Sequence, residues 1–250
     1  MSPPTTSKLK DEKELLHLTL HNDYYDLVRM NKIVNDKDYQ MGSITGGSWE
    51  KMGILQIKML ISKFKLNPYH HVLDIGCGDL RGGIKIMKYL QPKYYHGLDM
   101  TKGLIDKGIE YATNNGLADK IDKENFVSNK IFDFSHFQEY LYQYAISMSV
   151  FTHLPISMLS ICMKKLEKKV ILDGGFVFSF YENTKNSSGP VVQHGKNGSF
   201  TTYPNRAPYH YKVSDIVACC QGTPWCPTFI GDWGHPDNEK LMLLQFNPWA

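Results

Sequence analysis

The feature that most constrains the fold is a cluster of glycines directly after a short apolar segment, in the run VLDIGCGDLRGG at Val72–Gly83. The apolar residues up to Ile75 predict a buried strand. The glycines allow the backbone to turn tightly and to approach a ligand without Cβ clashes. In an open α/β sheet such a turn lies at the carboxyl ends of the strands, where these folds bind ligands. The run therefore predicts a ligand-binding loop.

Strand-like and helix-like segments alternate around this loop. Strand-like runs lie at His71–Ile75, Tyr94–Leu98, Asn125–Ser128, Tyr144–Ser149, Gly175–Tyr181, Pro227–Gly231 and Lys240–Phe246. Helical periodicity marks Trp49–Phe64, the segment from the glycine loop to Leu90, Thr101–Asn114, Ser157–Lys168 and Ser214–Gln221. The alternation predicts an α/β fold with a doubly wound, mostly parallel seven-stranded sheet that helices cover on both faces. No helix separates the last two strands, so one of them is expected to be antiparallel.

Three further expectations concern local structure and domain boundaries. Ser48 is expected to cap the helix that begins at Trp49. The stretch Asn183–Pro208 is rich in Asn, Ser, Gly and Pro and is expected to be a long loop. Residues 1–45 are expected to form a polar tail and a helical N-terminal extension, and residues 46–250 a single domain.

Composition indicates the setting in which the chain works. A net charge of +3 over 250 residues is small for a dedicated nucleic-acid binder. No apolar run reaches transmembrane length, and the polar N-terminus lacks the apolar stretch of a signal peptide. The five cysteines show no CxxC spacing typical of metal sites. We therefore expect a cytoplasmic protein with neither a membrane nor a nucleic-acid partner; the sequence does not indicate its oligomeric state.

A second carboxylate follows the next strand. Asp99 closes the segment Tyr94–Leu98, at a spacing that suits a group accepting hydrogen bonds from both hydroxyls of a ribose. A dinucleotide-binding loop would read GxGxxG, but Arg81 stands at the third glycine position. Asp74 and Asp79 also bring negative charge to the place where a pyrophosphate would bind, which suits a cationic sulfonium and an ammonium group instead. These residues favour S-adenosylmethionine over NAD as the cofactor.

With these residues the sequence resembles the class I S-adenosylmethionine-dependent methyltransferases over Gly46–Phe246. The runs SVFTHL at Ser149–Leu154 and LDGGF at Leu172–Phe176 follow the order of motifs in that family. The chain is similar in particular to a subgroup with an LRGG loop and a GDWGHP run, here Gly231–Pro236, which often accompanies sugar or polysaccharide genes. Leu80 stands where the family commonly has a third glycine.

The resemblance implies a Rossmann-like methyltransferase fold and a set of cofactor contacts. The glycine loop would hold the methionine part of the cofactor, Asp99 its ribose, and the turn Asn129–Lys130 would flank its adenine. The expected cofactor-binding residues are Asp74, Gly76, Cys77, Gly78, Arg81, Asp99, Met100, Asn129, Lys130, Ser149 and Trp49. Two of them have alternatives: Arg81 could bind an acidic substrate or pair with Asp79, and Trp49 could belong to the core.

The segment after the fourth strand bears on the reaction. Enzymes that methylate planar amino groups carry an Asn/Asp-Pro-Pro-aromatic run there, and metal-dependent catechol-type enzymes carry an Asp. This chain has neither, so we expect methylation of a hydroxyl without a catalytic metal. His153 is the predicted general base, because an imidazole titrates near neutral pH; the alternative is that it caps the following helix.

Several aromatic and polar residues further along the chain are candidates for the acceptor site. Glu182, Tyr209 and Tyr211 are the predicted substrate-binding residues. The tyrosines, with the neighbouring Tyr203, His194 and His210, could instead anchor the long loop. His235 is expected to be a turn residue between Gly234 and Pro236.

The predicted function is transfer of a methyl group from S-adenosylmethionine to a hydroxyl of a small molecule. A sugar or nucleotide-sugar is the acceptor class that the resemblance suggests. Two alternatives stay open. One is an RNA or protein methyltransferase, which a large basic face around the pocket would favour. The other is a cofactor-binding pseudo-enzyme that acts as a partner subunit, which a blocked acceptor pocket would favour.

Overall fold

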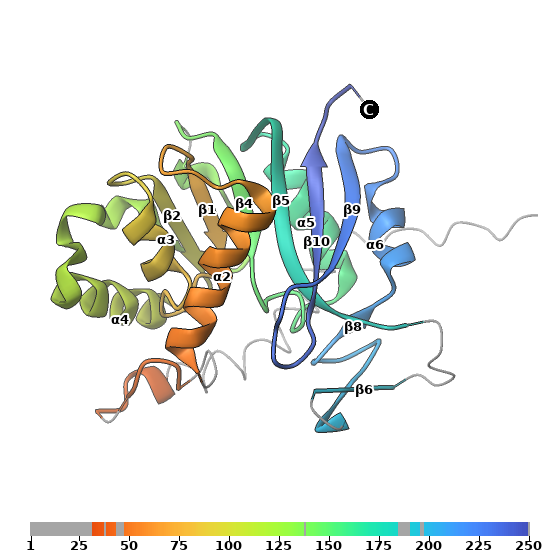
Figure 1. The fold of residues 1–250 in the computed structure, drawn as a ribbon, viewed down its shortest axis with the longest axis horizontal. Helices are drawn as coiled ribbons and strands as arrows, with labels where there is room; N and C mark the ends of the chain where they lie inside the picture. Colours follow the sequence, from red (N-terminus) through yellow and green to blue (C-terminus); the bar gives the residue numbers. More distant parts are fainter. Residues whose placement is uncertain are drawn as a thin grey trace, which may run out of the picture.

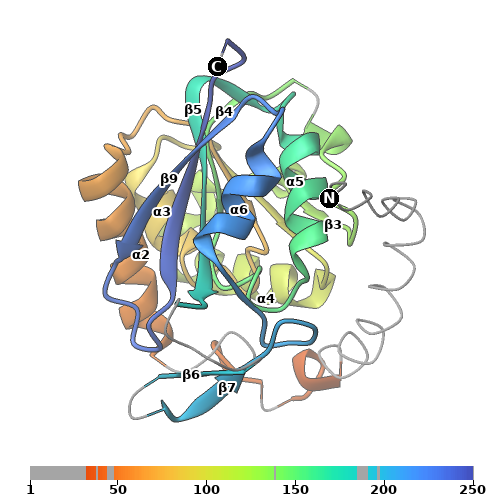
Figure 2. The ribbon, with the colours of Figure 1, turned by 90° about the vertical axis from the view of Figure 1, so that its right-hand side faces the viewer.

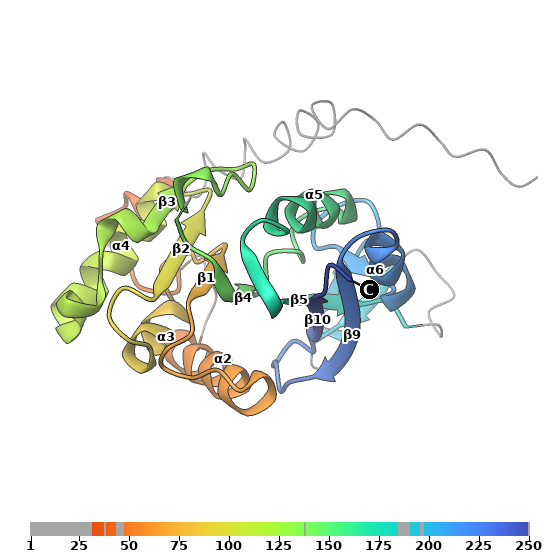
Figure 3. The same cartoon turned by 90° about the horizontal axis from the view of Figure 1, so that it is seen from above.

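The computed structural model describes residues 32–37, 39–43, 48–137, 139–184, 191–195 and 198–249. The polar tail and most of the helical extension expected in residues 1–45 lie outside these residues, as does the expected domain boundary near residue 46. In the described part of the chain a central sheet separates two layers of helices (Figures 1 and 3).

The strands of the sheet run in the order β3-β2-β1-β4-β5-β10-β9, and β8 pairs with β5 beside this path. Their bounds are β1 Val72–Ile75, β2 Tyr95–Asp99, β3 Phe126–Ser128, β4 Tyr142–Ser147, β5 Val170–Glu182, β8 His210–Tyr211, β9 Trp225–Asp232 and β10 Lys240–Phe246. Strand β10 is antiparallel to both of its neighbours, whereas β1 to β5 pair in parallel. The predicted doubly wound, mostly parallel sheet is confirmed, with its direction of growth reversing between β1 and β4.

Helices cover both faces of this sheet. They are α2 Trp49–Phe64, α3 Gly83–Tyr89, α4 Lys102–Ala112, α5 Ile156–Leu166 and α6 Val213–Cys220. Short helical turns lie at η1 Thr113–Leu117, η2 Ala118–Lys120, η3 Lys123–Asn125 and η4 Ser135–Phe137. Helices α2, α3 and α4 contribute to one core cluster, and α5 and α6 to the other, on opposite sides of the sheet (Figure 3). No helix of the described residues is long and apolar enough to cross a membrane.

The innermost strand shows how the two cores form and where polarity enters. Successive side chains of a strand point to opposite faces, and accordingly Val72 packs with α2 and α3 while Leu73 packs with α5. All of β1 is buried, as a central parallel strand must be. Asp74 is its polar exception. A buried carboxylate in a central strand is costly without partners, so its position points to a functional edge of the sheet.

The stretch Asn183–Pro208 is where the structure departs most from expectation. It contains an antiparallel pair, β6 Val192–His194 and β7 Phe200–Thr202, so the prediction of a continuous loop was wrong. This hairpin lies at the end of the sheet where β5 finishes (Figure 2), and the ring of Tyr181 contacts the rings of His194 and Phe200. Aromatic residues on both strands give the hairpin an apolar face to pack, which a reading of Gly, Asn and Ser content overlooked.

Two smaller predictions were also wrong. Ser48 adopts a left-handed conformation, with φ 60° and no side-chain hydrogen bond to the helix, so it does not cap α2 through its hydroxyl. The fourth strand ends at Ser147 rather than Ser149, because Ser149 has φ 61° and turns the chain away from the sheet. That turn brings Ser149 to the carboxyl edge of the strands.

Candidate active site

The glycine loop Gly76–Leu80 leaves β1 in a backbone conformation that side chains rarely adopt. Gly76 has φ 78° and Gly78 φ 55°. A Cβ at Gly76 would lie 2.2 Å from Val150 Cγ2, so the turn after β4 packs directly on the loop. Leu80 also has a positive φ, 62°, and its side chain is fully buried. Burial of that side chain offsets the strain at the position where the family resemblance had suggested a glycine.

The carboxylate of Asp99, at the end of β2, is held by the backbone of two loops. Its Oδ2 accepts a hydrogen bond from Gly78 N at 2.9 Å, and its Oδ1 accepts one from Thr101 N at 2.8 Å. Burial raises the pKa of Asp99 to about 6, although these two hydrogen bonds lower it. Each oxygen keeps a second lone pair, so the carboxylate can still accept hydrogen bonds from ligand hydroxyls. The structure therefore places Asp99 against the glycine loop.

The carboxylate of Asp74 lies beneath the same loop. Tyr95 donates its hydroxyl to Asp74 Oδ2 at 2.7 Å. Burial raises the pKa of Asp74 to about 7; the Tyr95 hydrogen bond and Arg81 lower it, and the neighbouring Asp99 raises it. Buried acids whose pKa values are raised ionise more readily once a cation lies beside them. This end of the sheet is therefore suited to a positively charged ligand.

Asp79 has a different role from the one its sequence position suggested. Its Oδ2 accepts hydrogen bonds from the Tyr39 hydroxyl at 3.0 Å and from Gly42 N at 2.8 Å, and its Oδ1 accepts one from Trp49 Nε1 at 2.9 Å. Asp79 is fully buried. The carboxylate thus ties the segment before α2 to the glycine loop. Trp49 is buried by this contact and packs edge-on against Tyr111, at a centroid distance of 5.2 Å, as the core alternative proposed.

Arg81 lies near acids from two parts of the chain, Asp74 and Asp79 at the glycine loop and Glu239 before β10. Burial lowers the pKa of its guanidinium, and the charges of Glu239, Asp79 and Asp74 raise it. Its position beside Asp79 keeps the ion-pair alternative open, and it also faces the loop between β9 and β10. The glycine loop that carries Arg81 is closely fitted to α2, because a Cβ at Gly53 would lie 2.3 Å from the Arg81 carbonyl oxygen.

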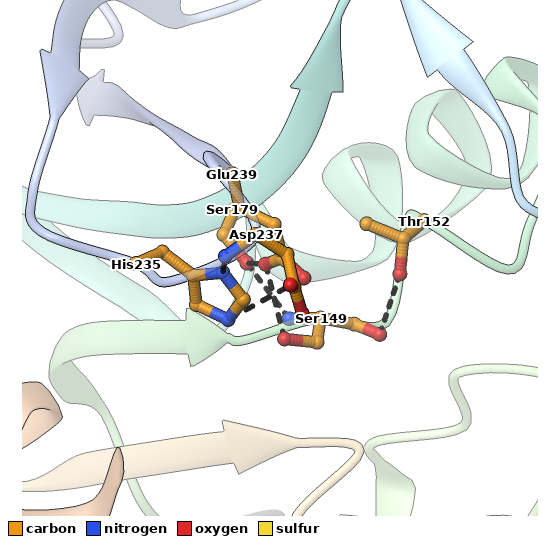
Figure 4. A network of polar contacts seen from close by, with 6 residues as sticks. All are labelled: Ser149, Thr152, Ser179, His235, Asp237 and Glu239. Carbon is orange, nitrogen blue, oxygen red and sulfur yellow. Dashed lines mark hydrogen bonds and ion pairs between the residues drawn. The ribbon is translucent and has the colours of Figure 1, made fainter. Parts of the chain in front are cut away.

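A network of polar contacts joins the turn after β4 to β5 and to the start of β10 (Figure 4). Glu239 Oε2 accepts hydrogen bonds from the Ser149 hydroxyl at 3.0 Å and from the Ser179 hydroxyl at 2.5 Å. Ser179 Oγ accepts the Ser149 N–H at 2.7 Å. On the other side of the carboxylate, His235 Nε2 lies 3.7 Å from Glu239 Oε1, and His235 Nδ1 accepts the Asp237 N–H at 3.2 Å.

Sequence reasoning found Ser149 but missed Ser179 and Glu239, and it assigned His235 to a turn only. Glu239 is 2% exposed and Ser179 fully buried. A signal was present, because Ser179 is the polar residue within the apolar run VFSF of β5. A polar side chain at a buried strand position needs a partner. The sequence alone did not show that this partner lies 60 residues away.

The other predicted cofactor residues lie along the same edge. Cys77 is buried in the glycine loop, where burial raises the pKa of its thiol. Met100 follows Asp99 directly and is half-buried. Asn129 N donates to the Asp99 carbonyl oxygen at 3.1 Å, which places the turn Asn129–Lys130 beside Asp99. The side chain of Asn129 is engaged with its own turn, since its Nδ2 donates to the Asp133 carbonyl oxygen at 2.8 Å.

The predicted catalytic and substrate-binding residues are less closely gathered. His153 is exposed in the turn after β4, where its N–H donates to the Val150 carbonyl oxygen at 2.9 Å. Tyr211 belongs to the core cluster, and its hydroxyl donates to the carbonyl oxygens of Phe151 and Leu154. Its contacts thus support the anchoring alternative. Tyr209 packs half-buried against the same core, and Glu182 is half-buried at the end of β5.

Two buried histidines lie at the β6–β7 hairpin: His194 belongs to β6 itself, and His210 belongs to β8 and contacts Thr202 of β7. His194 is 6% exposed and His210 is 4% exposed. His210 Nδ1 and the Thr202 hydroxyl are hydrogen-bonded at 2.8 Å. Within the described part of the chain, neither Nε2 atom has a hydrogen-bond partner. Buried polar atoms are normally satisfied, so these two nitrogens are candidates for contact with a ligand.

The sequence matches no protein-family model and no curated protein sequence. Solved structures do share its fold. The 1,6-didemethyltoxoflavin-N1-methyltransferase of Burkholderia thailandensis, with S-adenosylhomocysteine bound, has a TM-score of 0.59 at 13% identity, over 98% of this chain and 93% of that one. The magnesium protoporphyrin IX methyltransferase of Synechocystis PCC 6803, with S-adenosylhomocysteine bound, has a TM-score of 0.57 at 17% identity, over 92% and 100%.

A third similar structure is the N-methyltransferase NodS of Bradyrhizobium japonicum WM9, in complex with S-adenosylhomocysteine. Its TM-score is 0.56 at 12% identity, over 92% of this chain and 100% of that chain. At such identities the likeness establishes the fold. The chain has the Rossmann-like fold that these methyltransferases share, over nearly its whole length.

Proposed function

We propose that this protein transfers a methyl group from S-adenosylmethionine to a hydroxyl of a small molecule, with a sugar or nucleotide-sugar as the acceptor class. The observation that carries the proposal is the pair Asp74 and Asp99. These two buried carboxylates flank a glycine loop, and their pKa values are raised to about 7 and about 6. They lie at the switch point of a fold that binds ligands there.

The charge of the site distinguishes between cofactors. S-adenosylmethionine carries a sulfonium and an ammonium group, which a cluster of acids attracts. A dinucleotide carries a pyrophosphate, which Asp74 and the neighbouring acids would repel. The loop also lacks the third glycine of the dinucleotide fingerprint. Among the acids and bases that shift the pKa of Asp74, Arg81 is the cation, so it is the residue proposed to bind the cofactor's carboxylate.

The chain's own residues would hold the two reactants in line. Asp99 would accept hydrogen bonds from the ribose hydroxyls, and the turn Asn129–Lys130, bonded to the Asp99 carbonyl, would flank the adenine. When bound, the cofactor supplies an electrophilic methyl group. Fixing an acceptor oxygen opposite that group removes most of the entropic barrier to the displacement. Ser149, Glu182 and the buried histidines His194 and His210 are the groups proposed to contact the acceptor.

The similar structures do not support hydroxyl methylation in particular, because two of the three named above are described as N-methyltransferases. The proposal of a hydroxyl acceptor therefore depends on the residues of this chain. The turn after β4 presents a half-buried serine side chain at Ser149 and an exposed histidine side chain at His153. These side chains can orient and deprotonate a hydroxyl. In the sequence-based proposal His153 is the base.

The test has two stages. Calorimetry should show binding of S-adenosylmethionine and S-adenosylhomocysteine and no binding of NAD; the reverse result contradicts the cofactor assignment. The second stage measures transfer of a radiolabelled methyl group to hexoses, nucleoside diphosphate hexoses, phenols, RNA and protein. Label in a small hydroxyl compound supports the proposal. Label in RNA or protein favours that alternative, and cofactor binding without any transfer favours a partner subunit.

A further inference from the structure

The network around Glu239 contains a buried acid that the proposed function has not yet used. Glu239 is 2% exposed and lies directly before β10. Two hydroxyls, of Ser149 and Ser179, donate to the same oxygen, Oε2, at 3.0 and 2.5 Å. Burial and the nearby Glu239 carboxylate both raise the pKa of the Tyr181 hydroxyl. Keeping a carboxylate in so buried a place is costly, and the chain supplies donors from two separate segments, the turn after β4 and strand β5.

The location of this network is as informative as its chemistry. Ser149 is half-buried, and its hydroxyl donates to the buried acid. The next residue, Val150, is the one that packs on Gly76 of the glycine loop. Ser149 is therefore next to both the proposed cofactor loop and the carboxyl ends of β4 and β5.

We propose that Glu239 takes the proton of the acceptor hydroxyl, with the Ser149 hydroxyl as the group that touches the acceptor and passes the proton on. This inference rests on the proposed function and concerns the same site. Ser149 Oγ already donates to Glu239 Oε2, so the last hydrogen bond of the relay exists in the structure. Ser179 holds the arrangement by bonding to both Ser149 N and Glu239.

The proton and electron balance is as follows. The acceptor oxygen forms a bond to the methyl carbon while the carbon–sulfur bond breaks and its electron pair stays on sulfur. The acceptor proton moves to Ser149 Oγ, and the Ser149 proton moves to Glu239 Oε2. Glu239 ends neutral, Ser149 is regenerated, and the acceptor is a neutral ether. Solvent later takes the proton from Glu239, so no further reactant is needed.

Several charged or titratable groups face Glu239. Charged or titratable neighbours come from the glycine loop, from β5 and from the loop before β10: they are Arg81, Tyr181, His235 and Asp237. His235 is not placed to be the base itself, because its Nδ1 already accepts the Asp237 N–H and its Nε2 faces Glu239. It is a positioning residue for the carboxylate. His153, on the exposed turn, is the competing candidate.

A readout that needs no acceptor tests the position of the Glu239 charge. S-adenosylmethionine carries a sulfonium charge that S-adenosylhomocysteine lacks. If Glu239 is the acid next to the transferred group, Glu239→Gln should weaken binding of S-adenosylmethionine by about three- to tenfold more than that of S-adenosylhomocysteine, because one opposing charge is lost. Calorimetry measures both constants. Asp232→Asn is the matched control, since it removes the same charge from an exposed position at the end of β9 that does not face Glu239, and the ratio of its two binding constants should equal that of the wild type.

Ser149→Ala tests whether Ser149 passes the proton on or only supports the structure around Glu239. It also provides a second test if the Glu239→Gln protein does not fold. It retains the Glu239 charge, so the ratio of the two affinities should stay at the wild-type value. Label transfer to the hexose and phenol panel should fall by about 10²-fold or more in both variants, the usual contribution of proton transfer.

An unchanged affinity ratio in Glu239→Gln, or wild-type transfer by Ser149→Ala, overturns the proposal. So does loss of transfer in His153→Ala together with normal transfer in Glu239→Gln. Failure of the wild-type protein to bind either cofactor form would instead contradict the proposed function itself.

Discussion

The two halves of the site are built in different ways. In the half formed by β1, β2 and the glycine loop, Asp99 and Asp79 are each held by hydrogen bonds from the protein, including backbone N–H groups. In the half formed by β5, β10 and the β6–β7 hairpin, His194 and His210 are buried with an Nε2 that bonds to no described residue. The acids at the glycine loop are held in place without a ligand, whereas the histidines at the hairpin carry polar atoms that a ligand would satisfy. His96 of β2 also has two ring nitrogens that bond to no described residue, but it lies among the rings of Phe137, Tyr140 and Tyr142.

This difference separates two properties that a methyltransferase needs. A preorganised half binds a constant cofactor with little ordering cost, because its groups already stand in place. A half with unsatisfied polar atoms can select its ligand, since an acceptor that leaves them unpaired is rejected. We therefore expect changes in the first half to alter cofactor affinity and changes in the second to alter acceptor use.

The largest effect is expected for Asp99→Ala. Losing charge-assisted hydrogen bonds to the ribose should weaken binding of S-adenosylhomocysteine by about 1.5–3 kcal/mol, or about 10- to 150-fold. Calorimetry measures the change. Asp106→Ala is the control, because Asp106 pairs with Lys102 on the exposed face of α4. Equal affinities for wild type and Asp99→Ala would remove the ribose assignment.

Gly53→Ala tests how rigidly the first half is held. The added Cβ would meet the Arg81 carbonyl oxygen at 2.3 Å, so α2 must move away from the glycine loop. The gain in helix propensity, about 1 kcal/mol, should be outweighed, leaving a net loss of about 1–2 kcal/mol in the free energy of unfolding. Urea unfolding measures it, with exposed Lys58→Ala in the same helix as control. A stabilised Gly53→Ala protein would show that this contact is loose.

The pH dependence of binding follows from the two raised pKa values. Asp74 and Asp99 have pKa values of about 7 and about 6, so lowering the pH from 7.5 to 6 protonates acids that a cation needs in ionised form. Affinity for S-adenosylmethionine should fall by about tenfold over this range, since one proton must leave for each ligand bound. Asp74→Asn should flatten the profile. A profile as steep in Asp74→Asn as in wild type would mean that another group titrates.

The same shifts have the opposite consequence for the protein without ligand. The folded-state pKa of Asp74 is raised above the ordinary value of 3.8, so between pH 4 and pH 7 the folded protein holds a proton that the unfolded chain has released. The stability that this proton contributes is present at low pH and is lost as the pH rises through 7. Cofactor affinity and apo-protein stability should therefore change in opposite directions over this window, as calorimetry and thermal unfolding can measure.

The smallest effects on stability and on cofactor affinity are expected in the second half. His194→Phe keeps a ring between Tyr181 and Phe200 and removes the unpaired buried nitrogen. The free energy of unfolding should rise by about 0.5–1 kcal/mol, while cofactor affinity changes by less than about twofold and methyl transfer is lost. His210→Phe should gain less stability, because it breaks the bond to the Thr202 hydroxyl. Retained transfer in His194→Phe would show that the hairpin only covers the site.

The contrast between the halves also explains what the sequence could predict. The helix Trp49–Phe64 and the strand Lys240–Phe246 have the predicted bounds, because periodicity over a continuous segment determines them. The first half of the site could be predicted for the same reason, because Asp74, the glycine loop and Asp99 follow one another within a single strand–helix–strand unit.

The second half could not be predicted in the same way. Ser149, Ser179 and Glu239 come from segments 30 to 90 residues apart, and the pairing of β5 with both β4 and β10 brings them together. The apolar residues around Ser179 in the sequence indicate that it is buried, but they do not indicate which group hydrogen-bonds to it. The hairpin histidines present the same difficulty, because their environment depends on how β6 and β7 pack against Tyr181 rather than on their neighbours in the chain.

The hydrogen bonds of Asp79 have a consequence for anyone who shortens this chain for expression. A protein beginning at Ser48 would retain every strand of the central sheet, yet it would lose the Tyr39 and Gly42 donors while the Trp49 donor remained. The acid would then be exposed to solvent or left underpaired next to the glycine loop. Residues 39–43 are thus a structural part of the binding domain, and a useful truncation ends before them.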